Sequence, residues 1–297
     1  MSDWSIIAGP SSESLAKNVA NDLNIKCFNV ESREFPDGEG KLKIENMSKI
    51  KKAIIIQGTH PPVNTNLIQL LFMANKLKKE GVDVHACIPY LGYARQDSEF
   101  QSGEIVSLEM MADSLEMVGI KTVSTVDIHS THGLGYFAIP IYSISAMSQL
   151  AMFVKNKLQL ESPLAVSPDF GGSERVQKFA DILNIEKISL KKSRSRTTGD
   201  VEMEETNIEV TNRDLLIIDD IISTGTSIQR AAKYLKELKA KRMITLCTHP
   251  LLLGKAIDKI KGEGVERIIG TNTLQSSVSE INVSSIIAEH YKTKIIS

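Results

Sequence analysis

Two adjacent acidic residues, Asp219 and Asp220, come between an apolar stretch and a run of small, hydroxyl-bearing residues. A segment with helical character starts at the end of this run, which consists of Ser223, Thr224, Gly225, Thr226 and Ser227. Small residues let backbone N–H groups approach an anion, and the amino end of a helix adds a partial positive charge. The two carboxylates would repel a bare phosphate, but they can accept hydrogen bonds from sugar hydroxyls. A sugar phosphate therefore satisfies both halves of the pattern.

The run of hydroxyl residues also permits a plainer interpretation. Ser and Thr are common capping residues, so the run could be an N-cap cluster on an ordinary connection between a strand and a helix. The preceding residues Leu215–Ile218 form a continuous apolar run, which is typical of a strand covered on both faces. The acid pair beside this strand favours the ligand-binding interpretation.

Strand-like and helix-like segments alternate along the whole sequence. Short runs rich in Ile and Val predict strands, among them "SIIAG", "KAIIIQG", "PLAVSPD" and "RMITLCTHP". Amphipathic segments lie between them: one ends at Gly81, and another begins at Ser107 as a cap and ends at Gly119. This alternation predicts an α/β protein with two tandem domains, each a largely parallel sheet flanked by helices. We place the domains at residues 1–144 and 145–297, and allow the last residues to pack back on the N-terminal domain.

Polar residues gather directly after the expected strands. The segments in question are "PYLGYARQD", "DIHSTH", "SPDFGG", "KKSRSRTTGD" and "DDIISTGTS". In open α/β sheets, ligands bind beyond the carboxyl ends of the strands. We therefore expect these segments to supply the functional residues.

The composition excludes several classes of protein. The chain has 297 residues, of which 42% are hydrophobic and 24% charged, and its net charge of −1 gives no indication of nucleic acid or membrane as a partner. The three cysteines, Cys27, Cys87 and Cys247, show neither zinc spacing nor a disulfide framework. These features predict a cytoplasmic protein.

The segment around Asp219 resembles the fingerprint of the type I phosphoribosyltransferase fold, which holds the ribose and 5-phosphate of phosphoribosyl pyrophosphate. Four further segments, "REFPDGEGKLKI", "PYLGYARQDSEF", "TVDIHSTHGLGYF" and "VSPDFGG", closely resemble the ribose-phosphate pyrophosphokinase family. The resemblance covers almost the full chain in the correct order. It implies two tandem type I phosphoribosyltransferase-like domains, and transfer of the β,γ-diphosphoryl group of ATP to ribose 5-phosphate, which gives phosphoribosyl pyrophosphate and AMP.

The resemblance also implies site residues. The acid pair and residues 223–227 would bind ribose 5-phosphate, His129 and Asp169 would hold Mg²⁺, and the ATP-binding residues would be Phe35, Asp37, Glu39, Arg95, Gln96, Asp97 and His129. In the family, the "FPDGE"-type segment reaches the nucleotide of a neighbouring subunit. The implied assembly is a dimer-based homo-oligomer, with a tetramer or a hexamer as alternatives. Taken alone, "FPDG" would instead indicate a plain turn.

Residues 190–203 form a basic, hydroxyl-rich run, for which a solvated hairpin tip is the plain interpretation. The resemblance implies a catalytic loop here, with Lys192 and Arg194 as its cations. Lys191 and Arg196 leave its register open by a residue or two. Cations that close over a diphosphoryl group would stabilise its charge and exclude water.

Two alternatives remain open from the sequence. One is a simple phosphoribosyltransferase that consumes phosphoribosyl pyrophosphate, and the other is a non-catalytic regulatory homologue. Departures from many relatives include Phe170 in "SPDFGG", and Ser223 and Gly225 in "DIISTGTS". They put allosteric control and the subunit count in doubt more than catalysis.

Overall fold

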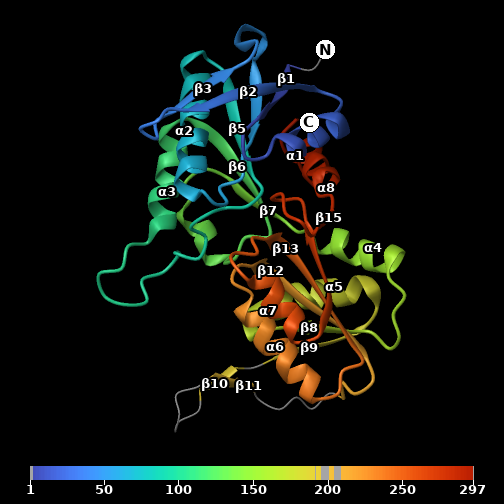
Figure 1. Cartoon of the computed structure of the whole chain (residues 1–297). Helices are drawn as coiled ribbons and strands as arrows, with labels where there is room; N and C mark the ends of the chain where they lie inside the picture. Colours follow the sequence, from blue (N-terminus) through green and yellow to red (C-terminus); the bar gives the residue numbers. More distant parts are fainter. Residues whose placement is uncertain (1–2, 191, 195–200, 204–208, 297) are drawn as a thin grey trace. The chain divides into compact units, whose positions relative to one another are not determined.

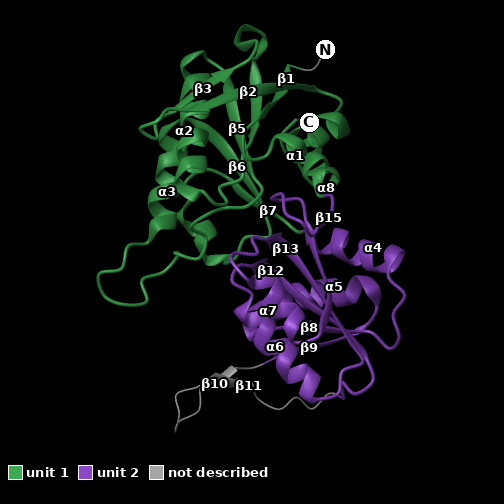
Figure 2. Cartoon of the chain, viewed as in Figure 1, with its two compact units in different colours: residues 1–145, 283–297 green, residues 146–282 purple. Residues whose placement is uncertain are grey.

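The computed structural model describes residues 3–190, 192–194, 201–203 and 209–296. The chain divides into two compact units, which we call unit 1 (Met1–Ser145 with Val283–Ser297) and unit 2 (Ala146–Asn282) (Figure 2). The carboxyl-terminal segment therefore belongs to unit 1 by its contacts. Among the described residues, none of the helices combines the length and the apolar character needed to cross a bilayer.

Unit 1 contains a seven-stranded sheet in the order β3-β2-β1-β4-β5-β6-β7 (Figure 1). Its strands are β1 (Trp4–Ala8), β2 (Lys26–Glu34), β3 (Gly40–Ile44), β4 (Lys52–Ile56), β5 (Asp83–Ile88), β6 (Ile120–Val126) and β7 (Ile141–Ile144). All neighbours are parallel except β2 and β3, which form an antiparallel hairpin. Its helices and 3-10 turns are α1 (Glu13–Leu23), α2 (Val63–Lys79), α3 (Ser107–Met117), α8 (Ser284–Lys294), η1 (Met47–Lys49) and η2 (His132–Tyr136).

Both faces of the unit 1 sheet are covered. Successive strand residues point to opposite faces, yet Ile6, Ile7, Ile54 and Ile55 are all fully buried. Ile7 and Ile55 pack with buried residues of α2 and α3. The helices α1 and α8 lie side by side and contact β1 and β7 (Figure 1).

Unit 2 contains a six-stranded, fully parallel sheet in the order β15-β14-β13-β12-β8-β9. Its strands are β8 (Leu164–Ser167), β9 (Glu186–Ser189), β12 (Asp214–Ile222), β13 (Arg242–Pro250), β14 (Val265–Thr271) and β15 (Ser279–Ile281). Its helices and one 3-10 turn are α4 (Met147–Lys157), η3 (Phe170–Gly172), α5 (Ser173–Leu183), α6 (Thr226–Glu237) and α7 (Ala256–Gly262). A separate two-stranded ladder joins β10 (Lys192–Arg194) to β11 (Val201–Met203).

The predicted fold class, α/β with largely parallel sheets, is confirmed, but two local predictions were wrong. Strand β12 does not end at Ile218: it continues to Ile222, so the acid pair lies within the strand. Ser107 is not the cap of α3 but its first residue, and no side chain caps that helix. Gly81 and Gly119 do follow helix ends, and both have the positive φ of such positions.

His85 of β5 couples the stability of unit 1 to pH. Its Nδ1 atom lies 2.7 Å from Thr122 Oγ1, and its ring centroid lies 5.1 Å from that of Trp4. Burial lowers the pKa of His85 from its ordinary value of 6.5 to about 4. The folded chain therefore binds this proton more weakly than the unfolded chain does, and acidification favours unfolding.

We predict that acidification from pH 6.5 to about 4 lowers the free energy of unfolding by about 2–3 kcal/mol through His85. This contribution to the free energy of unfolding is present above the pKa of His85 in the unfolded chain, and it is lost as the pH falls toward the pKa of His85 in the folded chain. Urea denaturation across this range should show a shallower pH dependence for His85→Gln than for the wild type. The exposed His132 supplies the control, His132→Gln. Equal pH dependence of wild type and His85→Gln would contradict the prediction.

Candidate functional site

The acid pair lies where strand β12 loses one of its two neighbours. Pairing with β13 continues to Ile222, whereas pairing with β8 covers only Leu215–Ile217. Strand β8 ends at Ser167, and the chain then turns through η3 beside β12. The acid pair therefore lies on the part of β12 that is no longer paired with β8.

The two acids differ in their surroundings. Asp220 is buried, and its Oδ2 atom lies 3.2 Å from Nη2 of Arg175 on α5. Asp219 is only partly buried, and its Oδ1 atom accepts the backbone N–H of Asp220 at 2.9 Å. Burial raises the pKa of Asp219 well above its ordinary value, and the charge of Asp220 adds to this effect. Arg175 acts in the opposite direction and limits the repulsion between the acids.

A third carboxylate belongs to the same place in unit 2. Asp169 caps the η3 turn, since its Oδ1 atom accepts the backbone N–H of Gly172 at 3.3 Å. The Oγ atom of Ser167 donates to the Asp169 carbonyl at 2.6 Å, which fixes the turn to the end of β8. Asp169 also contributes to the raised pKa of Asp219. The structure thus brings the predicted metal-binding acid into electrostatic contact with the predicted ribose-binding acid Asp219.

The hydroxyl run leads from β12 into helix α6, as predicted. Gly225 has a φ of +77°, and a Cβ atom there would lie 3.1 Å from the Ala256 carbonyl oxygen. Only glycine fits this position without strain. Helix α6 has no side-chain cap, and the Oγ1 atoms of Thr224 and Thr226 lie 3.2 Å apart. The first N–H groups of a helix lack intrahelical acceptors, so those at the start of α6 can bind an anion.

The predicted nucleotide residues of unit 1 lie on three segments, which follow β2, β5 and β6. Residues 35–39 form the loop of the β2–β3 hairpin, in which Phe35 N–H donates to the Glu39 carbonyl at 2.8 Å. Asp37 and Glu39 are exposed, and the Arg33 guanidinium lies 5.3 Å from the centre of the Phe35 ring. The turn interpretation of "FPDG" therefore describes the backbone correctly, and it leaves Asp37 and Glu39 accessible to a ligand.

The second segment follows β5. Arg95 and Gln96 are exposed, whereas Asp97 is buried and its carbonyl accepts the hydroxyl of Tyr136 at 2.9 Å. Tyr136 belongs to η2, on the connection after β6 that also carries the exposed His129. The structure thus joins residues 95–97 to the connection that contains His129.

The predicted catalytic cations lie on β10, where the structure describes the backbone. Lys192 pairs with Met203 of β11 and Arg194 with Val201. The register alternatives Lys191 and Arg196 lie outside the described residues. A hairpin-like ladder is therefore present, and the roles of the two cations remain a prediction.

Sequence reasoning missed Arg175, which contacts the acid pair directly. A signal was present, because Arg175 lies in the first turn of a helix, where the helix dipole disfavours a cation. An arginine at such a position needs a carboxylate partner nearby, and here the partner is Asp220.

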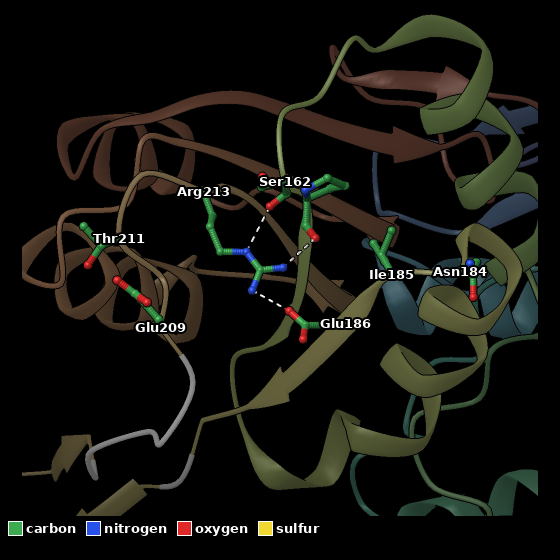
Figure 3. Close-up of a pocket in the computed structure, with 8 residues that line it drawn as sticks. Ser162, Asn184, Ile185, Glu186, Glu209, Thr211 and Arg213 are labelled. Atoms are coloured by element: carbon green, nitrogen blue, oxygen red, sulfur yellow. Dashed lines mark hydrogen bonds and ion pairs between the residues drawn. The ribbon is translucent and has the colours of Figure 1, made fainter.

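A pocket of unit 2 lies at the opposite, amino-terminal ends of the strands (Figure 3). Its lining residues flank the starts of β8, β9 and β12: Ser162, Pro163, Asn184, Ile185, Glu186, Glu209, Thr211 and Arg213. Arg213 crosses it and donates to the Ser162 carbonyl at 3.0 Å, to the Pro163 carbonyl at 3.1 Å and to Glu186 at 2.5 Å. All three nitrogens of the guanidinium are thus engaged within unit 2, which indicates a structural role.

No cluster of three or more His, Cys, Asp or Glu side chains that could hold a metal ion is found among the residues that the structure describes. Asp169 is nevertheless partly exposed and carries carboxylate oxygens, the donors that Mg²⁺ prefers. Its chemistry therefore fits a magnesium ion that keeps much of its water.

Comparisons with known proteins cover nearly the whole chain. A family described as the N-terminal domain of ribose phosphate pyrophosphokinase matches residues 4–119, and one described as the phosphoribosyl transferase domain matches residues 143–286. The chain is 38% identical over 288 residues to the ribose-phosphate pyrophosphokinase of Methanothermobacter thermautotrophicus, which covers 97% of this chain and 99% of that protein. It is 37% identical over 294 residues to that of Methanobrevibacter smithii, with 95% and 98% covered. The crystal structure of phosphoribosylpyrophosphate synthetase from Mycobacterium smegmatis matches with a TM-score of 0.87 at 26% identity and covers 98% of each chain.

The hydrogen bonds of the Arg213 guanidinium in the pocket of Figure 3 lead to a prediction about stability. We expect Arg213→Met to lower the free energy of unfolding by about 1–3 kcal/mol, because one exposed carbonyl, one partly buried carbonyl and one exposed carboxylate lose their donor. Lys178→Met is the control: Lys178 forms an exposed pair with Glu174, and its substitution should cost less than about 0.5 kcal/mol. Thermal and urea denaturation compare the two variants. Equal stability of both variants would contradict the structural role of Arg213.

Proposed function

This chain belongs to the ribose-phosphate pyrophosphokinase family, and we propose that it transfers the β,γ-diphosphoryl group of ATP to the C1 hydroxyl of ribose 5-phosphate. The products are phosphoribosyl pyrophosphate and AMP. The enzyme would thereby supply activated ribose for nucleotide biosynthesis. Its free cysteines suit the cytoplasm, where we place it.

One observation supports the sugar-phosphate half of this proposal above all others. In unit 2, the acids Asp219 and Asp220 lie on β12, three residues before the hydroxyl run that opens helix α6. Carboxylates suit the hydroxyls of a sugar, and a helix amino terminus suits a phosphate. Ribose 5-phosphate carries both groups on one small molecule. A ligand with only one of them would leave half of the site unused.

The residues of this site have distinct roles in the proposed reaction. Residues 223–227 anchor the 5-phosphate, and the acid pair accepts hydrogen bonds from the ring hydroxyls and orients the sugar. The C1 hydroxyl attacks the β-phosphorus of ATP in line, and AMP leaves. The protein then contributes mainly through positioning and charge neutralisation, as is common in phosphoryl transfer.

The nucleotide half of the proposal rests on unit 1. Arg95 can meet phosphate oxygens, Gln96 and Asp97 can bind the nucleotide, and His129 lies on the connection joined to them through Tyr136. Phe35 offers an aromatic face to adenine, with Asp37 and Glu39 beside it to read the edge of the base.

The hairpin position supports an oligomer. In the sheet order, β1 and β4 separate β2 from β5. At about 4.8 Å between neighbouring strands, residues after β2 start about 14 Å from those after β5. This separation within one chain favours the idea that the hairpin loop serves the nucleotide of a neighbouring protomer. We therefore propose a homo-oligomer, built from dimers.

We propose Mg²⁺ as the cofactor. Asp169 would hold it through its carboxylate, and His129 would act through a metal-bound water or on the ATP phosphates, since an imidazole is a poor direct partner for magnesium. When bound, Mg²⁺ neutralises charge on the ATP phosphates. Asp219 and Asp220 add negative charge near Asp169, which favours a cation there.

A direct test measures AMP release from ATP with the purified full-length chain. We expect AMP to appear only when ribose 5-phosphate and Mg²⁺ are both present, in equal amount to phosphoribosyl pyrophosphate. Removal of metal by chelation should stop the reaction, and added Mg²⁺ should restore it. A simple phosphoribosyltransferase would instead turn a nucleobase and phosphoribosyl pyrophosphate into a nucleotide. A regulatory homologue would bind both ligands without turnover, and either result would overturn the proposal.

The cations of the β10 segment generate a second prediction. Lys192→Ala and Arg194→Ala should each lower kcat by on the order of 100–1,000-fold, because each loses charge stabilisation that acts mainly in the transition state. Lys191→Ala and Arg196→Ala are matched controls that remove a neighbouring cation and should change kcat less than about 5-fold. If the two pairs of variants exchange these outcomes, the assumed register of the segment is wrong.

A further inference from the structure

Arg175 occupies an unusual place beside the acid pair of unit 2. It lies in the first turn of α5, and its side chain is 15% exposed while that of its partner Asp220 is 4% exposed. A separation of 3.2 Å between Nη2 and Oδ2 makes this a largely desolvated ion pair. Such pairs contribute little net stability, and removal of one partner leaves an uncompensated buried charge.

The turn before α5 is shaped so that the guanidinium can pack there. A Cβ atom on Gly172 would lie 2.5 Å from Ser167 Oγ and 3.5 Å from Arg175 Nη1. The Ser167 hydroxyl therefore occupies the space that a side chain at position 172 would need, and the Arg175 guanidinium lies beside this space. Ser167 in turn holds the Asp169 carbonyl at 2.6 Å. The Asp169 turn, Arg175 and Asp220 thus form one packed assembly.

Arg175 places a positive charge beside the acids of this assembly. Asp219 interacts electrostatically with Asp169 and Asp220, and Arg175 acts on Asp219 and forms an ion pair with Asp220. Like charges this close repel one another strongly in a partly buried place. Loss of the guanidinium would remove the ion pair that holds Asp220 Oδ2 at 3.2 Å from Arg175 Nη2, and a shift of that carboxylate would alter the face that the acid pair offers to a ligand.

From these contacts we propose that Arg175 is a positioning residue for ribose 5-phosphate: it holds the Asp220 carboxylate in place, so that the acid pair meets the sugar hydroxyls in a fixed geometry. Arg175 acts through Asp220 and not by contact with the reacting atoms. This inference rests on the proposed function and concerns the ribose side alone. A purely structural ion pair would affect folding but would not change the kinetic constants for one substrate in particular. The proposed role of Arg175 predicts such a substrate-specific change.

Strand β12 offers a matched control at its other end. Asp214, its first residue, is also 4% exposed, and its Oδ2 atom lies 2.8 Å from Nη2 of Arg242. The pair Arg242–Asp214 therefore has the same chemistry and a similar burial of the acid, but it lies at the amino end of the strand, away from the acid pair. Arg175→Met and Arg242→Met remove equivalent guanidinium groups, and only the first removal touches the proposed site.

The experiment compares wild type, Arg175→Met, Arg175→Lys and Arg242→Met. For each, thermal unfolding is recorded, and kcat and KM are measured for ribose 5-phosphate and for ATP at a temperature where all four proteins are folded. We expect Arg175→Met to lower kcat/KM for ribose 5-phosphate by about 100-fold, the scale seen when one partner of a buried charge pair is removed. The KM for ATP should stay within about 2-fold, and Arg175→Lys should recover part of the loss because it keeps the charge but not the planar fork. Arg242→Met should lose thermal stability and keep the kinetics of the wild type.

The outcomes distinguish failure of the inference from failure of the proposed function. If wild type releases AMP in a ribose 5-phosphate-dependent reaction but Arg175→Met behaves like Arg242→Met, the inference is overturned and the function stands. An equal change in the constants for both substrates would also overturn it. If wild type shows no such reaction, the proposed function fails, and the positioning role fails with it.

Discussion

Negative charge gathered at one end of β12 is the constraint on which the site in unit 2 depends. Three carboxylates, from Asp169, Asp219 and Asp220, interact in a place that is partly removed from water. Burial raises the pKa of Asp219 most, the charges of Asp220 and Asp169 raise it further, and Arg175 acts in the opposite direction. A site with excess negative charge favours ligands that bring hydroxyl groups and a metal cation. The start of α6 lies close by in the chain and favours an anion, because the amino terminus of a helix carries a partial positive charge. A sugar phosphate suits both parts of the site, because it carries hydroxyl groups and a phosphate on one molecule.

The parallel sheet of unit 2 separates stability from chemistry along the strands. At the amino ends, two arginines form structural contacts. Arg213 donates hydrogen bonds to two carbonyls and to Glu186, and Arg242 forms an ion pair with the buried Asp214. At the carboxyl ends, Asp169 follows β8 and the acid pair lies in the last part of β12, where Asp169 and Asp219 are partly accessible and Asp220 is buried. Connections can vary at the carboxyl edge without disturbing the paired core, which is why ligands gather there in folds of this class.

Much of the fold could be predicted from the sequence because strand–helix alternation and apolar runs are strong signals. The site segments were recognisable for a similar reason, since "DDIISTGTS" combines acids, small residues and a helix start. Local hydrogen bonding was harder to predict. Asp219 and Asp220 looked like loop residues because acids are rare in buried strands, yet pairing with β13 carries the strand to Ile222. Ser107 looked like a cap because of its residue type alone, whereas capping depends on backbone geometry.

The partners in particular long-range contacts could not be predicted from the sequence. Arg175 meets Asp220 only because η3 turns the chain back beside β12, and nothing in the spacing of these residues specifies that turn. The sequence allowed the last residues to pack back on the N-terminal domain but did not specify their contacts: His290 lies 2.9 Å from Ser124 across 166 positions of the chain. Contacts of this type follow from the topology of the sheets and not from local propensity.

The central claim is that the acid pair and the hydroxyl run together seat ribose 5-phosphate. A crystal structure of the full-length chain with ribose 5-phosphate tests it most directly. The account predicts the 5-phosphate at the backbone N–H groups of residues 224–227 and two sugar hydroxyls within about 3.2 Å of the Asp219 and Asp220 carboxylates. A phosphate bound elsewhere, or a sugar that does not contact either acid, would contradict it.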